Sequence, residues 1–242
     1  MCSAHGFELA FELAFDLYYS RKKGEKMGKI QVAVIVEDHP YDVISFQKML
    51  DSFTDCDCYV QPYDLFVRDE DGNNEKYDTV LYYNMMWNSP PEDSAVTKYM
   101  KEELGRTKQG IILLHHALIS FQGCELFTEV CGLRNRGGDG SFKYTQNQHA
   151  KQIVSDVAHP ITAGVSSFTL VDETYILGEP EEPGNTVLIT TDNETSIKNL
   201  AWVREYKNSK VFCYAAGHDN NAYGDSNFRK VLHNAIHYTA GR

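Results

Sequence analysis

The sequence lacks any apolar run long enough to span a membrane, so we expect neither a transmembrane helix nor a membrane partner. It also lacks an excess of basic residues, because 23 Lys and Arg stand against 34 Asp and Glu, for a net charge of −11. Proteins that bind nucleic acid need a basic surface to neutralise phosphates, so nucleic acid is not an expected partner. The 242 residues, of which 42% are hydrophobic and 24% charged, have the composition of one globular domain.

The sequence has no CxxC pair and no dense cysteine framework, although it contains six cysteines. A chain of this length can bury a sizeable core without disulfides, so we interpret these residues as reduced thiols and expect a cytoplasmic protein. Cys56 and Cys58 form the closest pair, and on a strand their side chains would share one face. That spacing is more typical of packing than of a metal site.

Residues 1–26 lack the features of a secretory signal peptide. A near-repeat at residues 7–15 contains two glutamates, and the basic residues at 21–23 follow it instead of preceding an uninterrupted apolar core. Residues 23–27 can be encoded by a bacterial ribosome-binding site that is translated just before the codon for Met27. We therefore hypothesise that residues 1–26 are a non-native or disordered leader and that residues 27–242 form the domain. The alternative is an amphipathic helix that docks on the domain.

From residue 29 onward, short apolar segments alternate with segments of helical spacing, which predicts an α/β fold. Gly110 is followed by four aliphatic residues, and such a run is typical of a strand buried on both faces of a parallel sheet. We expect strands at residues 30–36, 58–60, 77–83, 110–114, 187–190, 201–203 and 211–214, with a strand-rich insert between 153 and 175. We expect helices at residues 43–50, 89–105, 121–130 and from about 226 onward.

Titratable residues fall where several of these strands should end. The pair His115-His116 follows the central strand, and the other groups are His39, Asp172-Glu173 and His218-Asp219. In open α/β sheets ligands bind beyond the carboxyl ends of the parallel strands, so a parallel sheet would bring these groups to one edge. The alternative for Asp172-Glu173 is a solvated strand edge.

Imidazoles and carboxylates at such an edge can carry out acid–base chemistry, and they are also the usual ligands of zinc. We predict His116, Glu173, His218, His115 and Asp172 as the catalytic candidates. A divalent metal such as zinc would be held by His116, His218 and Glu173, although no HxH or HExxH spacing supports a metal. Because adjacent residues on an extended backbone face opposite ways, we expect His116 to face the site and His115 to pack behind it.

Four separated motifs, in this order, resemble the ThuA-like (trehalose utilisation) family. They are the segment 110–121 with its histidine pair, residues 159–162 leading to Asp172-Glu173-x-Tyr175, residues 200–206, and Gly217-His218-Asp219. The resemblance spans roughly residues 29–241. It implies a flavodoxin-like, three-layer α/β/α sandwich with a mainly parallel central sheet, as in class I glutamine amidotransferases. It also implies a role in sugar metabolism, on disaccharides or oxidised (keto) sugars.

One departure from the amidotransferases bears on the chemistry. Those enzymes carry a cysteine in a tight turn after the central strand, and this sequence has His115 and His116 there and no cysteine before Cys124. Glutamine hydrolysis through a thiolate is therefore not expected. A hydrolase that uses Cys124 or Cys131 is disfavoured too, because both fall at a predicted helix.

The resemblance implies that the ligand is a small carbohydrate. We predict His39, Trp87, Tyr175 and Asp219 as substrate-binding residues, and Trp87 could stack on a sugar face from its strand-end loop. Trp202 lies within an apolar strand and is interpreted as core, and we interpret His159, which precedes a proline, as structural.

Two functions remain open from the sequence. The first is a sugar-processing enzyme of hydrolase, lyase or isomerase type that uses the His and carboxylate groups, with or without a metal. The second is a non-catalytic sugar-binding or regulatory module that kept the fold without the thiol. A homo-oligomer is compatible with either.

Overall fold

A computed structural model describes residues 28–68, 72–155 and 157–242, and the predicted leader lies outside these ranges. In the described residues the strands are β1 (Ile30–Glu37), β2 (Cys56–Gln61), β3 (Thr79–Asn84), β4 (Gly110–Leu114), β5 (Lys143–Val154), β6 (Phe168–Ile176), β7 (Thr186–Thr190), β8 (Asn199–Tyr206) and β9 (Ser209–Tyr214). The α-helices there are α2 (Val43–Asp51), α3 (Tyr63–Val67), α4 (Ala95–Glu102), α5 (Glu125–Cys131), α6 (Asn220–Gly224) and α7 (Ser226–Ala240). Short 3₁₀ helices are η1 (Asn73–Lys76), η2 (His115–Ile119) and η3 (Pro160–Thr162).

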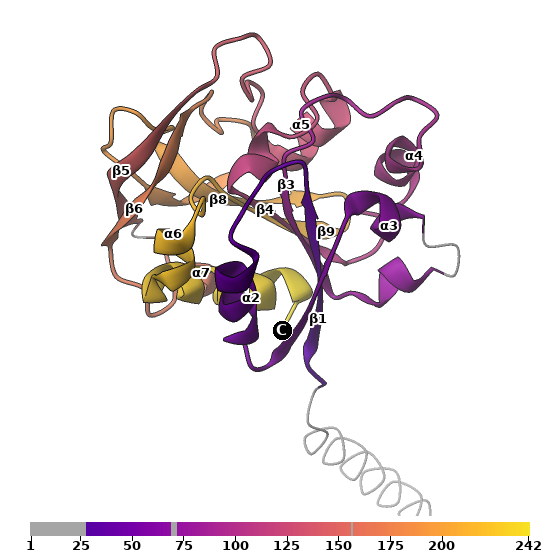
Figure 1. The fold of residues 1–242 in the computed structure, drawn as a ribbon, viewed down its shortest axis with the longest axis horizontal. Helices are drawn as coiled ribbons and strands as arrows, with labels where there is room; N and C mark the ends of the chain where they lie inside the picture. Colours follow the sequence, from indigo (N-terminus) through magenta and orange to yellow (C-terminus); the bar gives the residue numbers. More distant parts are fainter. Residues whose placement is uncertain (1–27, 69–71, 156) are drawn as a thin grey trace, which may run out of the picture.

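The described strands form one mixed sheet of nine strands in the order β2-β1-β3-β4-β9-β8-β7-β5-β6. The first five strands in this order, β2, β1, β3, β4 and β9, pair in parallel. The remaining strands, β8, β7, β5 and β6, continue the sheet from β9 with antiparallel pairings. The sequence-based expectation of an α/β fold with a parallel sheet is therefore confirmed for one end of the sheet, and the other end is antiparallel. Figure 1 shows β1, β3, β4 and β9 through the middle of the molecule, with β5 and β6 at one side.

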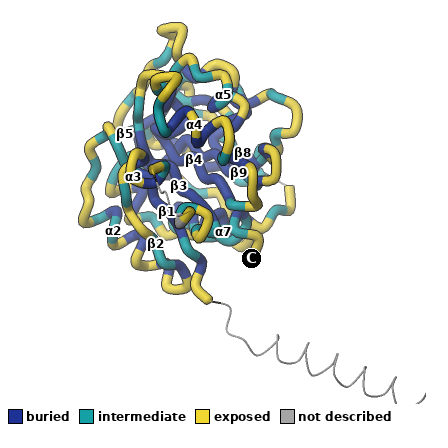
Figure 2. The backbone as a smooth tube through the Cα atoms, turned by 90° about the vertical axis from the view of Figure 1, so that its right-hand side faces the viewer, coloured by how far each residue is buried: buried dark blue, intermediate teal, exposed yellow. Residues whose placement is uncertain are grey.

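The parallel strands are buried along their length, as their aliphatic runs predict. Every residue of β3 and of β4 is buried. Figure 2 shows this central part of the backbone in dark blue, with exposed segments around it. Because helices must cover both faces of such strands, sequences of this kind specify an α/β arrangement.

The helices fall into two groups that pack against the parallel strands. In the first group, α7 contacts β4, β9, β1 and β3, while α6 contacts α7 and α2 contacts α6. In the second group, α4 contacts both α3 and α5. In Figure 1, α2, α6 and α7 lie to the left of β1, and α3 and α4 lie to its right. Helix α7 approaches β4 so closely that a Cβ on Gly110 would lie 2.6 Å from the backbone carbon of Thr239. The glycine that opens the central strand is thus required by this close approach.

The antiparallel hairpin of β5 and β6 differs most from the expectation. Strand β5 begins at Lys143, ten residues before the predicted insert, and most of its side chains are exposed or half-buried. Within the described ranges, no helix is both long and apolar enough to cross a membrane.

Candidate functional site

The histidine pair follows β4 in a tight left-handed turn. His115 has a φ of 51°, in the left-handed region that non-glycine residues seldom adopt, and it opens η2. Backbone strain of this kind persists where the surroundings hold the residue in place, and it is concentrated at functional sites. Here the turn redirects both histidine side chains, so the alternation of an extended backbone does not apply to them.

The His115 ring lies at the centre of a buried cluster. Its Nδ1 is 2.8 Å from the carbonyl oxygen of Ala215, which can only accept, so Nδ1 carries the proton and Nε2 presents a lone pair. The Tyr175 hydroxyl lies 2.7 Å from Nε2 and donates to it, and the two rings stack with centroids 4.5 Å apart. The Ala215 contact therefore fixes the tautomer of His115 and the direction in which its free nitrogen points.

Glu173 and His218 complete this cluster. Glu173 Oε1 lies 3.5 Å from His115 Nε2 and 3.5 Å from His218 Nδ1, and the two ring nitrogens are 3.2 Å apart. All three are atoms that can carry a lone pair, so a proton or a cation is needed to hold them together. We call His115, Glu173 and His218 the His–Glu cluster; a ligand atom from each lies within 4.8 Å of the others.

The protonation states within the cluster follow from burial and charge. Burial acts to raise the pKa of Glu173, but its interactions with His115 and His218 outweigh burial and leave this pKa below its ordinary value. Burial, followed by the charge of His115, lowers the pKa of His218. Near neutral pH the cluster thus pairs an ionised carboxylate with a neutral imidazole. The His218 side chain keeps 21% of its surface exposed, so it can exchange protons with solvent.

His116 takes a different position from the expected one. Its Nε2 donates to the Tyr83 carbonyl oxygen at 3.0 Å, and its ring stacks on His39 with centroids 4.1 Å apart and an angle of 22° between the planes. Burial and the charges of His115 and His39 hold its pKa well below the ordinary value. The structure therefore reverses the expected orientation: His115 replaces His116 beside Glu173 and His218, because the left-handed turn swings the first ring into the cluster. The side chains that converge are those of His115, His218 and Glu173, whereas the predicted metal set was His116, His218 and Glu173.

Several buried polar atoms near the carboxyl ends of the parallel strands have no hydrogen-bond partner among the described residues. They are Nδ1 of His39, Nδ1 of His116, and both amide atoms of Asn84 at the end of β3. A buried polar atom without a partner costs about 1–3 kcal/mol. These atoms are therefore available to a polar ligand that enters at this edge of the sheet.

Asp172 anchors the site from within the protein. Its carboxylate accepts from the backbone N–H of Gly217 at 2.6 Å, of His218 at 2.9 Å and of Glu173 at 2.9 Å. Burial raises the pKa of Asp172, although these hydrogen bonds oppose the rise. Asp172 and Glu173 are both buried, so the alternative of a solvated strand edge is wrong.

Tyr83 and Tyr223 support the loop after β9, and the sequence analysis did not identify them. The two hydroxyls lie 2.5 Å apart, and the Tyr83 hydroxyl donates to the carbonyl oxygen of Gly217 or of His218, at 2.8 and 3.0 Å. The position of Tyr83, one residue before the end of β3, was a signal for a role at this edge. Both tyrosines hold the backbone that carries His218.

The predicted substrate-binding residues are placed unequally. Tyr175 and His39 contact the cluster histidines directly, whereas Trp87 is 39% exposed and reaches Tyr175 only through Phe142, with ring centroids 5.7 and 5.3 Å apart. Trp87 also lines a pocket of about 440 Å³ together with Asp38, the residue before His39. Asp219 accepts from the N–H of Asn221 at 2.8 Å and caps α6, a structural contact that does not test its predicted role.

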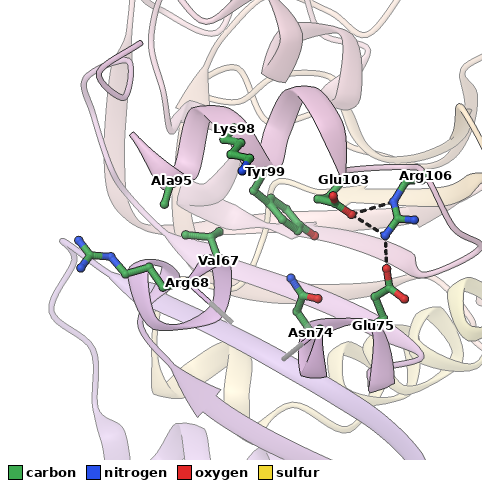
Figure 3. A pocket seen from close by; sticks show the side chains of 10 residues that line it. Val67, Arg68, Asn74, Glu75, Ala95, Lys98, Tyr99, Glu103 and Arg106 are labelled. Carbon is green, nitrogen blue, oxygen red and sulfur yellow. Dashed lines mark hydrogen bonds and ion pairs between the residues drawn. The ribbon is translucent and has the colours of Figure 1, made fainter. Parts of the chain in front are cut away.

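A separate pocket of about 480 Å³ lies between α3, η1 and α4 (Figure 3). The residues that line it include none of the predicted site residues. Arg106 there pairs with Glu75 and Glu103, as the dashed lines in Figure 3 show. These three charged groups of the pocket thus neutralise one another.

The thiols lie apart from this chemistry. Cys124 caps α5, and Cys131 is buried at the end of that helix, where burial raises the pKa of its thiol to about 11. Neither side chain is among the contacts of the His–Glu cluster. A thiolate mechanism through Cys131 is disfavoured, because the thiolate is the nucleophile and burial keeps this thiol protonated.

Comparison with known proteins places this geometry in context. The sequence profile of the family described as "Trehalose utilisation" (ThuA) matches residues 66–239. A ThuA-like protein from Parabacteroides merdae is similar in structure, with a TM-score of 0.70 and 16% identity over 88% of this chain and 90% of that one.

Two more distant structures share the fold alone. A GMP synthase protein from Thermoplasma acidophilum gives a TM-score of 0.51 at 12% identity, covering 89% of this chain and 96% of the other. A beta-galactosidase from Rahnella sp. R3 gives 0.54 at 14% identity, where 87% of this chain matches 31% of that one. A search of the curated proteins finds no match to this chain.

Proposed function

The chain belongs to the ThuA (trehalose utilisation) family, and we propose that it is an enzyme that transfers a proton at the carbon next to the carbonyl group of an oxidised (keto) sugar. The observation that carries the proposal is the convergence of His115 Nε2, His218 Nδ1 and Glu173 Oε1 within 4.8 Å. An ionised carboxylate next to a neutral imidazole is the arrangement that general acid–base catalysis requires. We further propose that the fold is the flavodoxin-like three-layer sandwich implied by the family.

The carboxylates favour proton transfer over glycoside hydrolysis. Most glycosidases need two carboxyl groups that flank the scissile bond, one as acid and one as base or nucleophile. Here Glu173 is free to react, whereas the Asp172 carboxylate accepts three backbone N–H groups and is buried. Among the three reaction types that the sequence left open, this geometry favours an isomerase or lyase.

Each residue of the site then has a role. Glu173 takes the proton from carbon, and the electron pair of the broken C–H bond moves onto the carbonyl oxygen as an enolate. Glu173 passes the proton to His218, 3.5 Å away, which keeps contact with solvent and returns the proton to the sugar or releases it. Tyr175 and the Ala215 carbonyl orient His115, so that its Nε2 faces the reacting group. His39, His116 and Asn84 offer their unpartnered polar atoms to the sugar hydroxyls, and Trp87 stacks on the outer part of the ligand.

The same cluster fits a divalent metal. His115 Nε2, His218 Nδ1 and Glu173 Oε1 would hold an ion such as zinc, which would take the place of the proton that Tyr175 donates to Nε2. The Nδ1 contact of His115 with a backbone carbonyl is the usual second contact of a metal-binding histidine. A bound ion would polarise the carbonyl oxygen of the sugar.

The test is to incubate the protein in D₂O with a disaccharide, and separately with the keto derivative of that disaccharide, and to follow the sugars by NMR. We expect solvent deuterium to enter the keto sugar next to its carbonyl group, and the parent disaccharide to stay unchanged. Release of monosaccharide from the parent disaccharide would contradict the proposal and indicate a hydrolase. Binding of either sugar with no exchange and no product would favour the non-catalytic alternative.

A further inference from the structure

A second group of metal-binding side chains lies at the opposite edge of the parallel strands. Asp55 directly precedes β2 and Cys56 opens it, so both stand at the amino end of a parallel strand. His233 and His237 lie one turn apart on α7. In the His–Glu cluster, by contrast, His115 and His218 follow the carboxyl ends of β4 and β9, and Glu173 lies on β6, so the two groups are separate.

The four side chains converge although about 180 residues separate Asp55 and Cys56 from the two histidines of α7. Asp55 Oδ1 lies 2.7 Å from His233 Nε2, and Asp55 Oδ2 lies 2.9 Å from His237 Nε2. The Cys56 sulfur is 3.7 Å from Asp55 Oδ1. A ligand atom from each of the four lies within 4.8 Å of the others.

This combination matches the preferences of zinc. Histidines at i and i+4 present their rings on one side of a helix, and thiolate, imidazole and carboxylate are the three zinc ligand types in proteins. Tetrahedral bonds of about 2.0–2.3 Å place ligand atoms about 3.3–3.8 Å apart. The present spacing needs only small side-chain movements to reach that geometry.

The surroundings support a structural ion. The side chains of Asp55, His233 and His237 keep 51%, 32% and 34% of their surface exposed, which leaves a path from solvent, while Cys56 is buried on the inner side. The Phe53 ring stacks on His233 with centroids 5.2 Å apart and fixes its orientation. Four protein ligands would leave no open position, as in structural zinc sites.

We propose that Asp55, Cys56, His233 and His237 bind one zinc ion that ties α7 to the start of β2. This site could not be predicted from the sequence, because about 180 residues separate Asp55 and Cys56 from the two histidines. In the sequence the nearest cysteine to Cys56 is Cys58, which lies on the same strand and is not among the four converging side chains.

Cobalt substitution tests the proposal on the full chain without any activity assay. One equivalent of Co²⁺ should give the sulfur-to-cobalt charge-transfer absorption in the near ultraviolet together with the intense visible bands of a tetrahedral site. The His–Glu cluster contains no sulfur, so cobalt bound there cannot produce the charge-transfer band. Cys56→Ser should abolish that band, and the matched control Cys58→Ser should keep it. A missing band in the wild type, or one that survives Cys56→Ser, would overturn the proposal.

Zinc-dependent stability gives a second, independent readout. Zinc should raise the melting temperature of the wild type and of Glu173→Gln, because Glu173 belongs to the other cluster. The same addition should give a smaller rise in His237→Ala, whose half-exposed side chain can be removed without opening the core, and any rise that remains should come from the His–Glu cluster. A rise that persists in His237→Ala but disappears in Glu173→Gln would place the ion at the His–Glu cluster and contradict the second site.

Discussion

The Tyr175 hydroxyl donates a hydrogen bond of 2.7 Å to Nε2 of His115. That nitrogen is free to accept because the other ring nitrogen donates to the Ala215 carbonyl oxygen. The pair links the antiparallel hairpin to the turn after the central parallel strand. It therefore sets the position of the His115 ring, which contacts both Glu173 and His218.

Replacing Tyr175 by Phe tests this link. The ring stack on His115 is kept while the hydroxyl donor is lost, so we expect the free energy of unfolding to fall by about 1 kcal/mol. The rate of exchange or turnover of the keto sugar should fall by more than the factor that corresponds to this free energy, because the hydroxyl no longer orients His115. Urea unfolding and the NMR exchange assay measure the two effects. An unchanged rate alongside lowered stability would mean that Tyr175 has only a structural role.

Replacing Asp172 by Asn tests the anchor beneath His218. The new amide group would place a donor against the backbone N–H of Gly217, or against those of His218 and Glu173, so at least one N–H would lose its acceptor. We expect a loss of about 1–3 kcal/mol in the free energy of unfolding. Glu173→Gln is the matched control, since Glu173 accepts from no backbone N–H among the described contacts, and it should cost less. Equal losses in both variants would contradict the anchoring role.

The histidines at this edge predict a pH dependence. Burial first, and then the charges of neighbouring histidines, lower the pKa of His39, His116 and His218 below the ordinary value of 6.5. Below pH 6.5 the unfolded chain thus binds more protons than the folded one, so stability falls as the pH drops from 6.5 through the folded pKa values. Above pH 6.5 these three histidines should no longer lower the free energy of unfolding.

Side-chain NMR titration measures this directly, with the protein unfolded in urea as the reference. The three rings should titrate at lower pH in the folded protein than in urea. Rings that titrate at or above 6.5 in the folded state would contradict the buried, mutually repelling arrangement.

Hydrophobic pattern and strand-end position predicted much of this structure. The aliphatic run after Gly110 indicated a buried parallel strand, and β4 occupies the middle of the parallel half of the sheet. The site residues at positions 39, 115 and 218 follow from the rule that parallel strands end at one edge. Helix α7 begins at Ser226, as its apolar spacing predicted.

Two features could not be predicted in this way. Strand β5 is mostly polar from Lys143 onward, so it gives no alternating pattern, and its hairpin partner β6 brings Glu173 and Tyr175 to the site by folding back toward the loop after β9. The choice between His115 and His116 depended on a single left-handed φ. A pattern of residue types does not encode that angle, because a non-glycine residue adopts it only where tertiary contacts impose it.

The central claim is that Glu173 acts as the base, and deuterium incorporation into the keto sugar by Glu173→Gln tests it most directly. Glutamine keeps the size of the side chain and removes its charge, so sugar binding should stay within about tenfold of the wild type while the exchange rate falls by about 10²–10⁴-fold. Glu179→Gln, a carboxylate that accepts from the backbone of Lys198 and Asn199, is the matched control and should exchange at the wild-type rate. Exchange in Glu173→Gln at the wild-type rate would contradict the account.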